Sequence, residues 1–294
     1  MKRNAETNRL IVSFLAPALL LYGAFVLLPA IGALRYSLLR WDGLSAPVFI
    51  GLENFRTILK PGSPLIAALE HNVYLTVVPG AIILGLALFF AYSIHQRIKG
   101  ARLFRIAFFF PNVISSVAVA LLWVLIYSTS GAGLLNNLLK SVFHLKEAIP
   151  FTQSDRLLPA LVPIIVWMAT GFYMLLFLAA MENVPEEYYE AARLDGASAF
   201  TVFRAITLPL IWEVLVTGVI FIVIGGLKIF EIVWVMENGR PSPQTHTLST
   251  LMYSKVFEEY DIGQGTAIAV VLFVLVLAAT LLSRRALRRE TLEY

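Results

Sequence analysis

Cysteine is absent from the 294-residue chain. Its absence excludes a disulfide framework, a thiolate metal site and a cysteine nucleophile. Charge is also scarce, because Asp, Glu, Lys and Arg make up 14% of the residues whereas apolar residues make up 59%. A soluble domain carries about 25% charged residues. The composition therefore indicates a protein that crosses a membrane several times.

Common catalytic motifs are missing as well. A Walker A loop ends in Gly-Lys-Ser/Thr, and the chain contains no Gly-Lys dipeptide. It contains neither a G-x-S-x-G elbow nor an H-E-x-x-H helix. The histidines are scattered over predicted span ends and loops, so solvated or interfacial histidines are favoured over metal ligands; they are His71, His95, His144 and His246. We expect no enzyme activity and no cofactor on this chain.

Long apolar windows identify the membrane spans. A bilayer core about 30 Å thick is crossed by roughly 20 apolar helical residues. The sequence predicts six spans, over about 11–34, 72–95, 106–128, 157–181, 210–235 and 263–283. The expected fold class is all-α, with residues 1–294 forming a single transmembrane domain.

Basic residues predict the orientation of the chain. They gather in residues 1–9, in the connector 95–105 (HQRIKGARLFR) and in the tail 284–290 (RRALRRE). In a six-span chain these segments lie on one side of the membrane, and positive-inside topology makes that side cytoplasmic. Both termini are therefore predicted to be cytoplasmic. The first span is too long for a removable signal peptide, so we expect it to stay as an anchor.

One acidic, amphipathic segment, residues 185–209, joins predicted spans four and five on the cytoplasmic side. Pro185 suits the first turn of a helix, and the two glutamates after it place negative charge at the positive end of the helix dipole. Gly196 can take the left-handed conformation that ends a helix, and Ser198 can cap a second one. The apolar positions of this second helix recur at helical spacing; they are Phe200, Phe203, Ile206 and Leu208.

The predicted product is a helix, a tight turn and a second helix at the membrane surface. An amphipathic connector that rests on lipid usually carries a basic polar face. This segment begins with acidic residues, which anionic lipid would repel. A protein partner is therefore the favoured interpretation, with Ala191 and Ala192 as a face that permits close approach.

The motif resembles a known signature. Glu190-Ala191-Ala192, then Asp195-Gly196-Ala197, then residues 206–209 (ITLP) resemble the EAA motif of binding-protein-dependent ABC importer permeases. Segments such as 167–174 (WMATGFYM) and the stretch after Gly226 resemble carbohydrate-type permeases, the first subunits of maltose-like and glycerol-phosphate-like systems. The resemblance extends over nearly the whole chain. It departs at 237–241 (ENGRP), where T-x-GGP is usual, and at Glu231, where aspartate is common.

This resemblance implies a type I ABC importer permease fold in a bacterial or archaeal cytoplasmic membrane. It implies a coupling helix that docks on a separate ATPase dimer, which would hold ATP and Mg. The implied docking residues are Glu190, Ala191, Ala192, Leu194, Asp195, Gly196 and Ala197. The resemblance implies two further partners. One is a second permease, a different chain with which this chain would form a heterodimer. The other is an external or periplasmic binding protein that delivers a sugar or sugar derivative.

Candidate substrate-path residues lie in spans four and five. Sugar recognition favours aromatic faces beside small and hydrogen-bonding groups, which span four offers in Trp167, Thr170, Gly171 and Tyr173. The resemblance implies that Gly225 and Lys228 of span five face them. Lys228 and Glu231 are three residues apart, so the sequence predicts them on one helical face, either as a structural pair or in contact with substrate.

Two other classes of function stay open on the sequence. A secondary transporter driven by an ion gradient would need carboxylates near the midplane and usually an internal repeat. The chain shows no repeat, and the acidic residues inside a predicted span, Glu213 and Glu231, lie toward its ends. A membrane scaffold without transport activity would explain the docking loop but not the permease-like segments that flank it.

Overall fold

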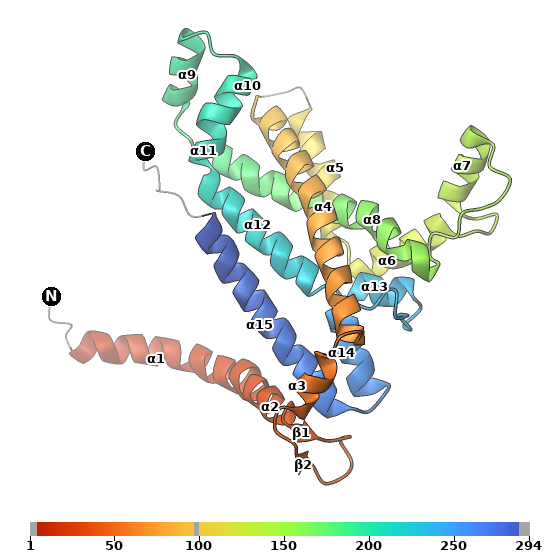
Figure 1. Cartoon of the computed structure of the whole chain (residues 1–294). Coiled ribbons are helices and arrows are strands. Elements are labelled where there is room, and N and C mark those ends of the chain that lie inside the picture. The colour runs from red at the N-terminus through yellow and green to blue at the C-terminus, as the bar shows by residue number, and fades with distance from the viewer. Residues whose placement is uncertain (1–4, 97–99, 288–294) are drawn as a thin grey trace. The chain divides into compact units, whose positions relative to one another are not determined.

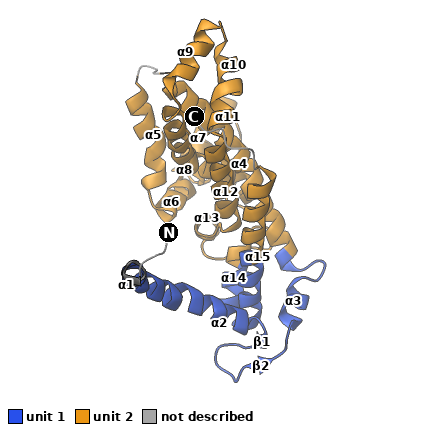
Figure 2. Ribbon diagram, turned by 90° about the vertical axis from the view of Figure 1, so that its left-hand side faces the viewer, with its two compact units in different colours: residues 1–65, 251–273 blue, residues 66–250, 274–294 orange. Residues whose placement is uncertain are grey.

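The computed structural model describes residues 5–96 and 100–287, and helices dominate it (Figure 1). The described chain divides into two compact units, residues 1–65 with 251–273 and residues 66–250 with 274–294 (Figure 2). The predicted all-α class is therefore confirmed. Parts of the basic segments that predict the orientation, residues 1–4, 97–99 and 288–290, lie outside the described residues.

Within the described ranges, five helices are long and apolar enough to cross a membrane; they cover Leu10–Tyr36, Pro64–His95, Ser154–Glu182, Trp212–Met236 and Ile262–Ala286. A sixth span arises if α5 (Ala101–Val113) and α6 (Ser116–Tyr127), which meet at 97°, count as one. The predicted third span is thus two helices. Ile114 and Ser115 separate them, because their extended backbone, with ψ of 140° and 133°, ends the helical hydrogen bonding of α5.

The first unit starts with a long apolar helix. α1 (Ala5–Tyr22) continues through the π-helical turn η1 (Gly23–Leu27) into α2 (Leu28–Tyr36). None of its most apolar window is buried within the chain. A helix that is apolar all round and uncovered by protein is stable only in lipid or against a partner.

A short hairpin follows this helix in the first unit. β1 (Leu39–Arg40) pairs antiparallel with β2 (Val48–Phe49), and α3 (Glu53–Ile58) comes directly after. The buried Asn54 donates from Nδ2 to the carbonyl oxygen of Leu39 at 2.8 Å. This side-chain bond fastens α3 to the hairpin, which has only two pairs of facing residues of its own.

The second unit is organised around α8 (Ser154–Glu182). Its largest fully buried side chains lie along the whole helix; they are Leu157, Leu161, Ile164, Met174, Phe177, Leu178 and Met181. The C-terminal half packs with α4 (Pro64–His95), and the N-terminal half packs with α6. α8 is buried on so many sides that its continuous apolar run belongs to the core rather than to lipid alone.

Further helices of the described residues belong to these two units. They are α7 (Leu134–Phe143), α12 (Trp212–Leu227), α13 (Glu231–Met236), α14 (Leu248–Phe257) and α15 (Ile262–Ala286). The start of α12 is tied to the end of α15, because Trp212 donates from Nε1 to the carbonyl oxygen of Leu287 at 2.7 Å. This bond fixes two ends that lie 75 residues apart in the sequence.

Candidate functional site

The acidic segment after α8 forms a helix as predicted. α9 (Glu186–Leu194) begins after Pro185, whose backbone is extended at φ −55° and ψ 134°. Two glutamates occupy its first turn and Arg193 its last turn. Both placements match the helix dipole, which is positive at the N-terminus and negative at the C-terminus.

The turn that ends α9 has the geometry that the Asp195-Gly196 pair predicts. Gly196 has a φ of 73°, in the left-handed region. Its N–H donates to the carbonyl of Arg193 at 3.1 Å, and the N–H of Ala197 donates to the carbonyl of Ala192 at 2.9 Å. These two bonds make a Schellman motif. A Cβ on Gly196 would meet no atom within 4 Å, so only the backbone conformation requires glycine here.

A second helical segment follows α9. Ser198 caps it as predicted, since Oγ accepts the N–H of Thr201 at 3.2 Å. α10 (Ala199–Val202), the π-helical turn η2 (Phe203–Thr207) and α11 (Leu208–Leu210) lead into α12. Figure 1 shows α9 and α10 together at one end of the second unit. The π-helical turn was not predicted, because no sequence rule distinguishes it from an α-helix.

Most of the predicted docking residues are exposed. The exposed set comprises Glu190, Ala191, Leu194, Asp195 and Gly196, and Ala197 is half-buried. Ala192 is buried at 7% exposure, so the prediction of an exposed Ala-Ala face is wrong. Neighbouring residues on a helix point about 100° apart, and Ala192 shares the inner face with Tyr189.

Two large apolar side chains are exposed on this hairpin of helices. Leu194 is 89% exposed at the end of α9, and Phe200 is 70% exposed on α10. The sequence pattern identified Phe200 only as an apolar position of the second helix. Its exposure is the feature that sequence reasoning missed, because helical spacing cannot say which face of a short helix is covered.

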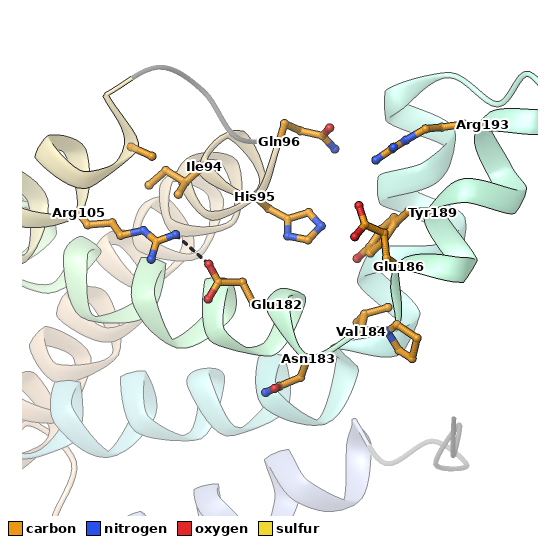
Figure 3. A pocket seen from close by; sticks show the side chains of 12 residues that line it. Ile94, His95, Gln96, Arg105, Glu182, Asn183, Val184, Glu186, Tyr189 and Arg193 are labelled. Atoms are coloured by element: carbon orange, nitrogen blue, oxygen red, sulfur yellow. Dashed lines mark hydrogen bonds and ion pairs between the residues drawn. The ribbon is translucent and has the colours of Figure 1, made fainter.

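A pocket of about 910 Å³ lies between α9 and the ends of α4, α5 and α8. Figure 3 shows charged and polar side chains around it, and Arg105 forms an ion pair with Glu182 across one wall at 2.8 Å. His95 contacts the ring of Tyr189, with 5.0 Å between ring centroids. Behind α9, apolar contacts join it to the rest of the second unit.

Those contacts belong to the first hydrophobic cluster of the second unit. Val184, Tyr189 and Ala192 are buried in it together with Ile94 of α4 and Met181 of α8. α9 is therefore attached through one inner stripe, while its outer face and its tip are open.

The candidate residues of α8 divide into buried and exposed positions. Thr170 and Tyr173 are 3% and 7% exposed, and the hydroxyl of Thr170 donates to the carbonyl of Val166 at 2.6 Å. Gly171 is buried against the backbone of α5. Trp167 is 39% exposed, and its ring centroid lies 6.2 Å from that of Trp123. In this chain, only Trp167 of the four offers a substantial open face.

The expectation that Lys228 and Glu231 share one helical face is wrong. α12 ends at Leu227 and α13 begins at Glu231, because Phe230 between them takes φ −135° and ψ −66°. Both ionisable side chains are exposed. Glu231 accepts a hydrogen bond from Ser116 of α6 instead of pairing with Lys228.

The two glycines before this break have different surroundings. Gly225 is exposed, and a Cβ there would meet no atom within 4 Å. A Cβ on Gly226 would lie 2.2 Å from Oγ1 of Thr76 in α4. Gly226 thus allows close packing of α12 against α4.

The described residues, 5–96 and 100–287, contain no group of three or more His, Asp or Glu side chains placed to hold a metal ion. His71 has a structural contact instead, since its Nδ1–H donates to the carbonyl oxygen of His246 at 2.7 Å.

Comparison with known proteins places this geometry in a family. The model of the family described as "Binding-protein-dependent transport system inner membrane component" matches residues 81–290. That range contains α5 to α15, and with them the whole hairpin of α9 and α10.

Two relatives and one solved structure are similar over most of their length. The chain is 34% identical over 275 residues to the diacetylchitobiose uptake system permease protein NgcF of Streptomyces coelicolor, covering 89% of this chain and 77% of that protein. It is 33% identical over 273 residues to the trehalose/maltose transport system permease protein MalF of Thermococcus litoralis, covering 90% of this chain and 89% of that one. A chain in the structure of a bacterial alginate ABC transporter, in complex with an alginate pentasaccharide-bound periplasmic protein, shares the fold with a TM-score of 0.80 at 24% identity, over 97% of both chains.

Proposed function

The chain belongs to the family of binding-protein-dependent transport system inner membrane components, and from this premise we propose that it is the permease subunit of an ATP-driven sugar importer. The substrate class rests on relatives whose names give a diacetylchitobiose and a trehalose/maltose system. The cargo of this chain is accordingly a sugar or a sugar derivative.

The observation that carries the proposal is the exposed hairpin of α9 and α10. The chain has no Walker A sequence, so free energy from ATP has to enter through contact with another subunit. The tip of α9 offers Glu190, Ala191 and Leu194 for such a contact, and all three are exposed. We assign the ATPase-docking surface to them, with Phe200 as an addition.

The attachment of α9 supports a role in transmitting motion. Its inner stripe, Tyr189 and Ala192, packs with Met181 near the end of α8, so a displaced α9 carries that end of α8 along. α8 is the central helix of the second unit. Closure of the ATPase on binding ATP would thereby shift the helices between inward- and outward-facing arrangements.

The remaining partners and the orientation follow from the same proposal. A second permease subunit would complete the path, an external binding protein would deliver the sugar, and ATP with Mg would bind to the ATPase. α9 and both termini would lie on the cytoplasmic side of a bacterial or archaeal cytoplasmic membrane, as the basic segments predict. The chain itself would form part of the transport path, and ATP hydrolysis would take place on the ATPase.

The test changes the backbone of the docking turn without creating a clash. In Gly196→Val the β-branched side chain disfavours the φ of 73°, whereas Gly196→Asn, the matched control, tolerates it. The parent and both variants are purified from the native membrane in mild detergent, and co-purifying proteins are identified by mass spectrometry. We expect an ATPase and a second permease with the parent and with the Asn variant, and loss of the ATPase from the Val variant.

Two results would contradict the proposal. A parent chain that arrives without any ATPase would make a gradient-driven transporter the function to test next. An ATPase that stays bound to the Val variant at parental yield would show that the docking surface is elsewhere on the chain.

A further inference from the structure

The break between α12 and α13 leaves backbone groups without helical partners. In a continuous helix each carbonyl accepts from the N–H four residues later. The break removes this arrangement for the carbonyls of Gly226, Leu227 and Ile229, because residues 228–230 are not helical. The carbonyl of Gly226 keeps a long backbone bond, from the N–H of Ile229 at 3.4 Å. Unpaired carbonyls inside a membrane protein are costly, so other groups have to bind them.

Asn72 of α4 binds two of these carbonyls. Its side chain is fully buried, and Nδ2 donates to the carbonyls of Gly226 at 2.8 Å and Leu227 at 3.1 Å. Its Oδ1 accepts the N–H of Leu248, the first residue of α14, at 2.8 Å. One amide therefore joins α4, the end of α12 and the start of α14.

Thr247 binds the third carbonyl. Its side chain is fully buried, and Oγ1 donates to the carbonyl of Ile229 at 2.9 Å. The N–H of Thr247 donates to Oγ1 of Thr250, which is also fully buried, at 2.8 Å. These hydrogen bonds fix the start of α14. Asn72 and Thr247 both connect the break between α12 and α13 to it.

One ionisable residue, Lys228, begins the segment 228–230, and another, Glu231, directly follows it. Lys228 and Glu231 are exposed and lie inside the apolar range Trp212–Met236. A charged side chain at such a depth faces water or protein rather than lipid. Within the proposed importer, we assign the two side chains to the translocation path.

We propose that Asn72 and Thr247 are positioning residues for the substrate path. They hold the non-helical residues 228–230 in one conformation and so set the separation and direction of Lys228 and Glu231. Only the assignment to a substrate path rests on the proposed importer function. The hydrogen bonds of Asn72 and Thr247 to the break belong to the described chain itself. Neither residue needs to touch the sugar.

Transport kinetics test the role with a matched pair. Thr247→Val keeps the shape and removes the hydroxyl, whereas Thr247→Ser keeps the hydroxyl. The whole transporter, purified with its partners and reconstituted in vesicles, is assayed with the sugar that its binding protein carries. We expect the Val variant to raise the sugar concentration for half-maximal uptake several-fold and to alter the preference among related sugars. The Ser variant should match the parent, and ATPase co-purification should be unchanged in both.

A second measurement does not depend on transport. The chain has no native cysteine, so nitroxides are attached at Lys228→Cys and Glu231→Cys, and their dipolar broadening reports the separation across the break. We expect a narrow distribution in the parent and with Thr247→Ser, and a broader one with Thr247→Val and with Asn72→Leu. The Asn72→Leu variant can misfold. If it is not recovered, the comparison of Thr247→Val with Thr247→Ser is sufficient to test the positioning role.

The outcomes separate the two proposals. An unchanged distribution and an unchanged uptake profile in the Val variant would overturn the positioning role, even if the amount of folded protein falls. If the parent complex imports no sugar, the proposed function fails, while the nitroxide measurement still decides whether Asn72 and Thr247 hold the break.

Discussion

Gly171 of α8 lies directly against Phe108 of α5. A Cβ atom on Gly171 would be 2.0 Å from the carbonyl oxygen of Phe108 and 2.7 Å from Cα of Phe109. Both neighbours are backbone atoms of a helix, so they cannot turn aside as the end of a side chain can. The crossing of α5 and α8 therefore depends on the absence of a side chain at residue 171.

Gly171→Ala should lower the free energy of unfolding by about 3 kcal/mol, as expected for overpacking a tight contact. Unfolding of the purified chain in detergent measures it. Gly225→Ala is the control, because a Cβ there meets nothing within 4 Å and should stabilise α12 by about 0.5–1 kcal/mol. Equal effects of the two substitutions would mean that the helices do not cross at this distance.

Asn136 holds the segment between α6 and α8 together. It is 1% exposed, and its Nδ2 donates to the carbonyls of Tyr127, Ser128 and Ile149 at 3.0–3.2 Å. Its Oδ1 accepts the N–H of Ile149 at 2.7 Å. Asn136→Leu should therefore destabilise the chain by about 2–4 kcal/mol, since it leaves several buried backbone groups unsatisfied.

The neighbouring Asn137 provides the control for that measurement. Asn137 is partnered in an exposed bond, from Nδ2 to the carbonyl of Gly131 at 2.7 Å, so Asn137→Ala should change the free energy of unfolding by less than about 1 kcal/mol. Thermal unfolding of both variants in detergent decides. A loss at Asn137 as large as that at Asn136 would show that position in the loop, rather than buried hydrogen bonding, sets the stability.

Glu237, just after α13, gives a pH dependence. Burial raises the pKa of its carboxyl above the ordinary value of 4.5, and hydrogen bonds from Thr245 and Ser154 act in the opposite direction. A raised pKa means that the folded chain holds the proton more tightly than the unfolded chain. Its contribution to stability is complete below the unfolded pKa and is lost as pH rises through the folded one.

Glu237→Gln should therefore remove part of the loss of stability that the parent shows as pH rises from about 4 toward neutrality. Thermal unfolding from acidic to neutral pH measures the slope. Glu147→Gln, at an exposed glutamate, is the control and should leave the parental slope. A Gln variant that keeps the full parental slope would contradict a proton held at Glu237.

The parts of the fold that follow from neighbouring residues could be predicted from the sequence. The turn at Gly196 and the cap at Ser198 depend on local hydrogen bonds, and both were predicted at the right residues. The apolar character of the long helices is likewise a property of consecutive residues.

The parts that depend on distant residues could not be predicted. Hydrogen bonds from Asn72 and Thr247 hold the break before Glu231. Asn72 is 154 residues from Gly226, and Thr247 is 18 residues from Ile229. The inward direction of Ala192 depends on its packing in a cluster with α4 and α8. A helical repeat of apolar residues predicts that a helix has a buried face, but it does not predict which other element packs against that face.

Substitution of Leu194 tests the proposed docking surface most directly. Leu194 is 89% exposed, so Leu194→Ala should leave the free energy of unfolding of the isolated chain within about 0.5 kcal/mol. A buried anchor at the centre of an interface contributes far more, and its loss should weaken ATPase binding about tenfold or more. Binding is measured by titrating the purified ATPase against the chain in nanodiscs.

Leu44→Ala supplies the matched comparison for Leu194. Leu44 is 92% exposed in the loop between β1 and β2, which the predicted topology places on the external side. The two substitutions remove the same atoms at nearly equal exposure, so any difference in ATPase affinity comes from location alone. Parental affinity for Leu44→Ala together with a weakened Leu194→Ala locates the contact at the tip of α9. Equal affinities would remove Leu194 from the docking surface, and Phe200 on α10 would be the next side chain to substitute.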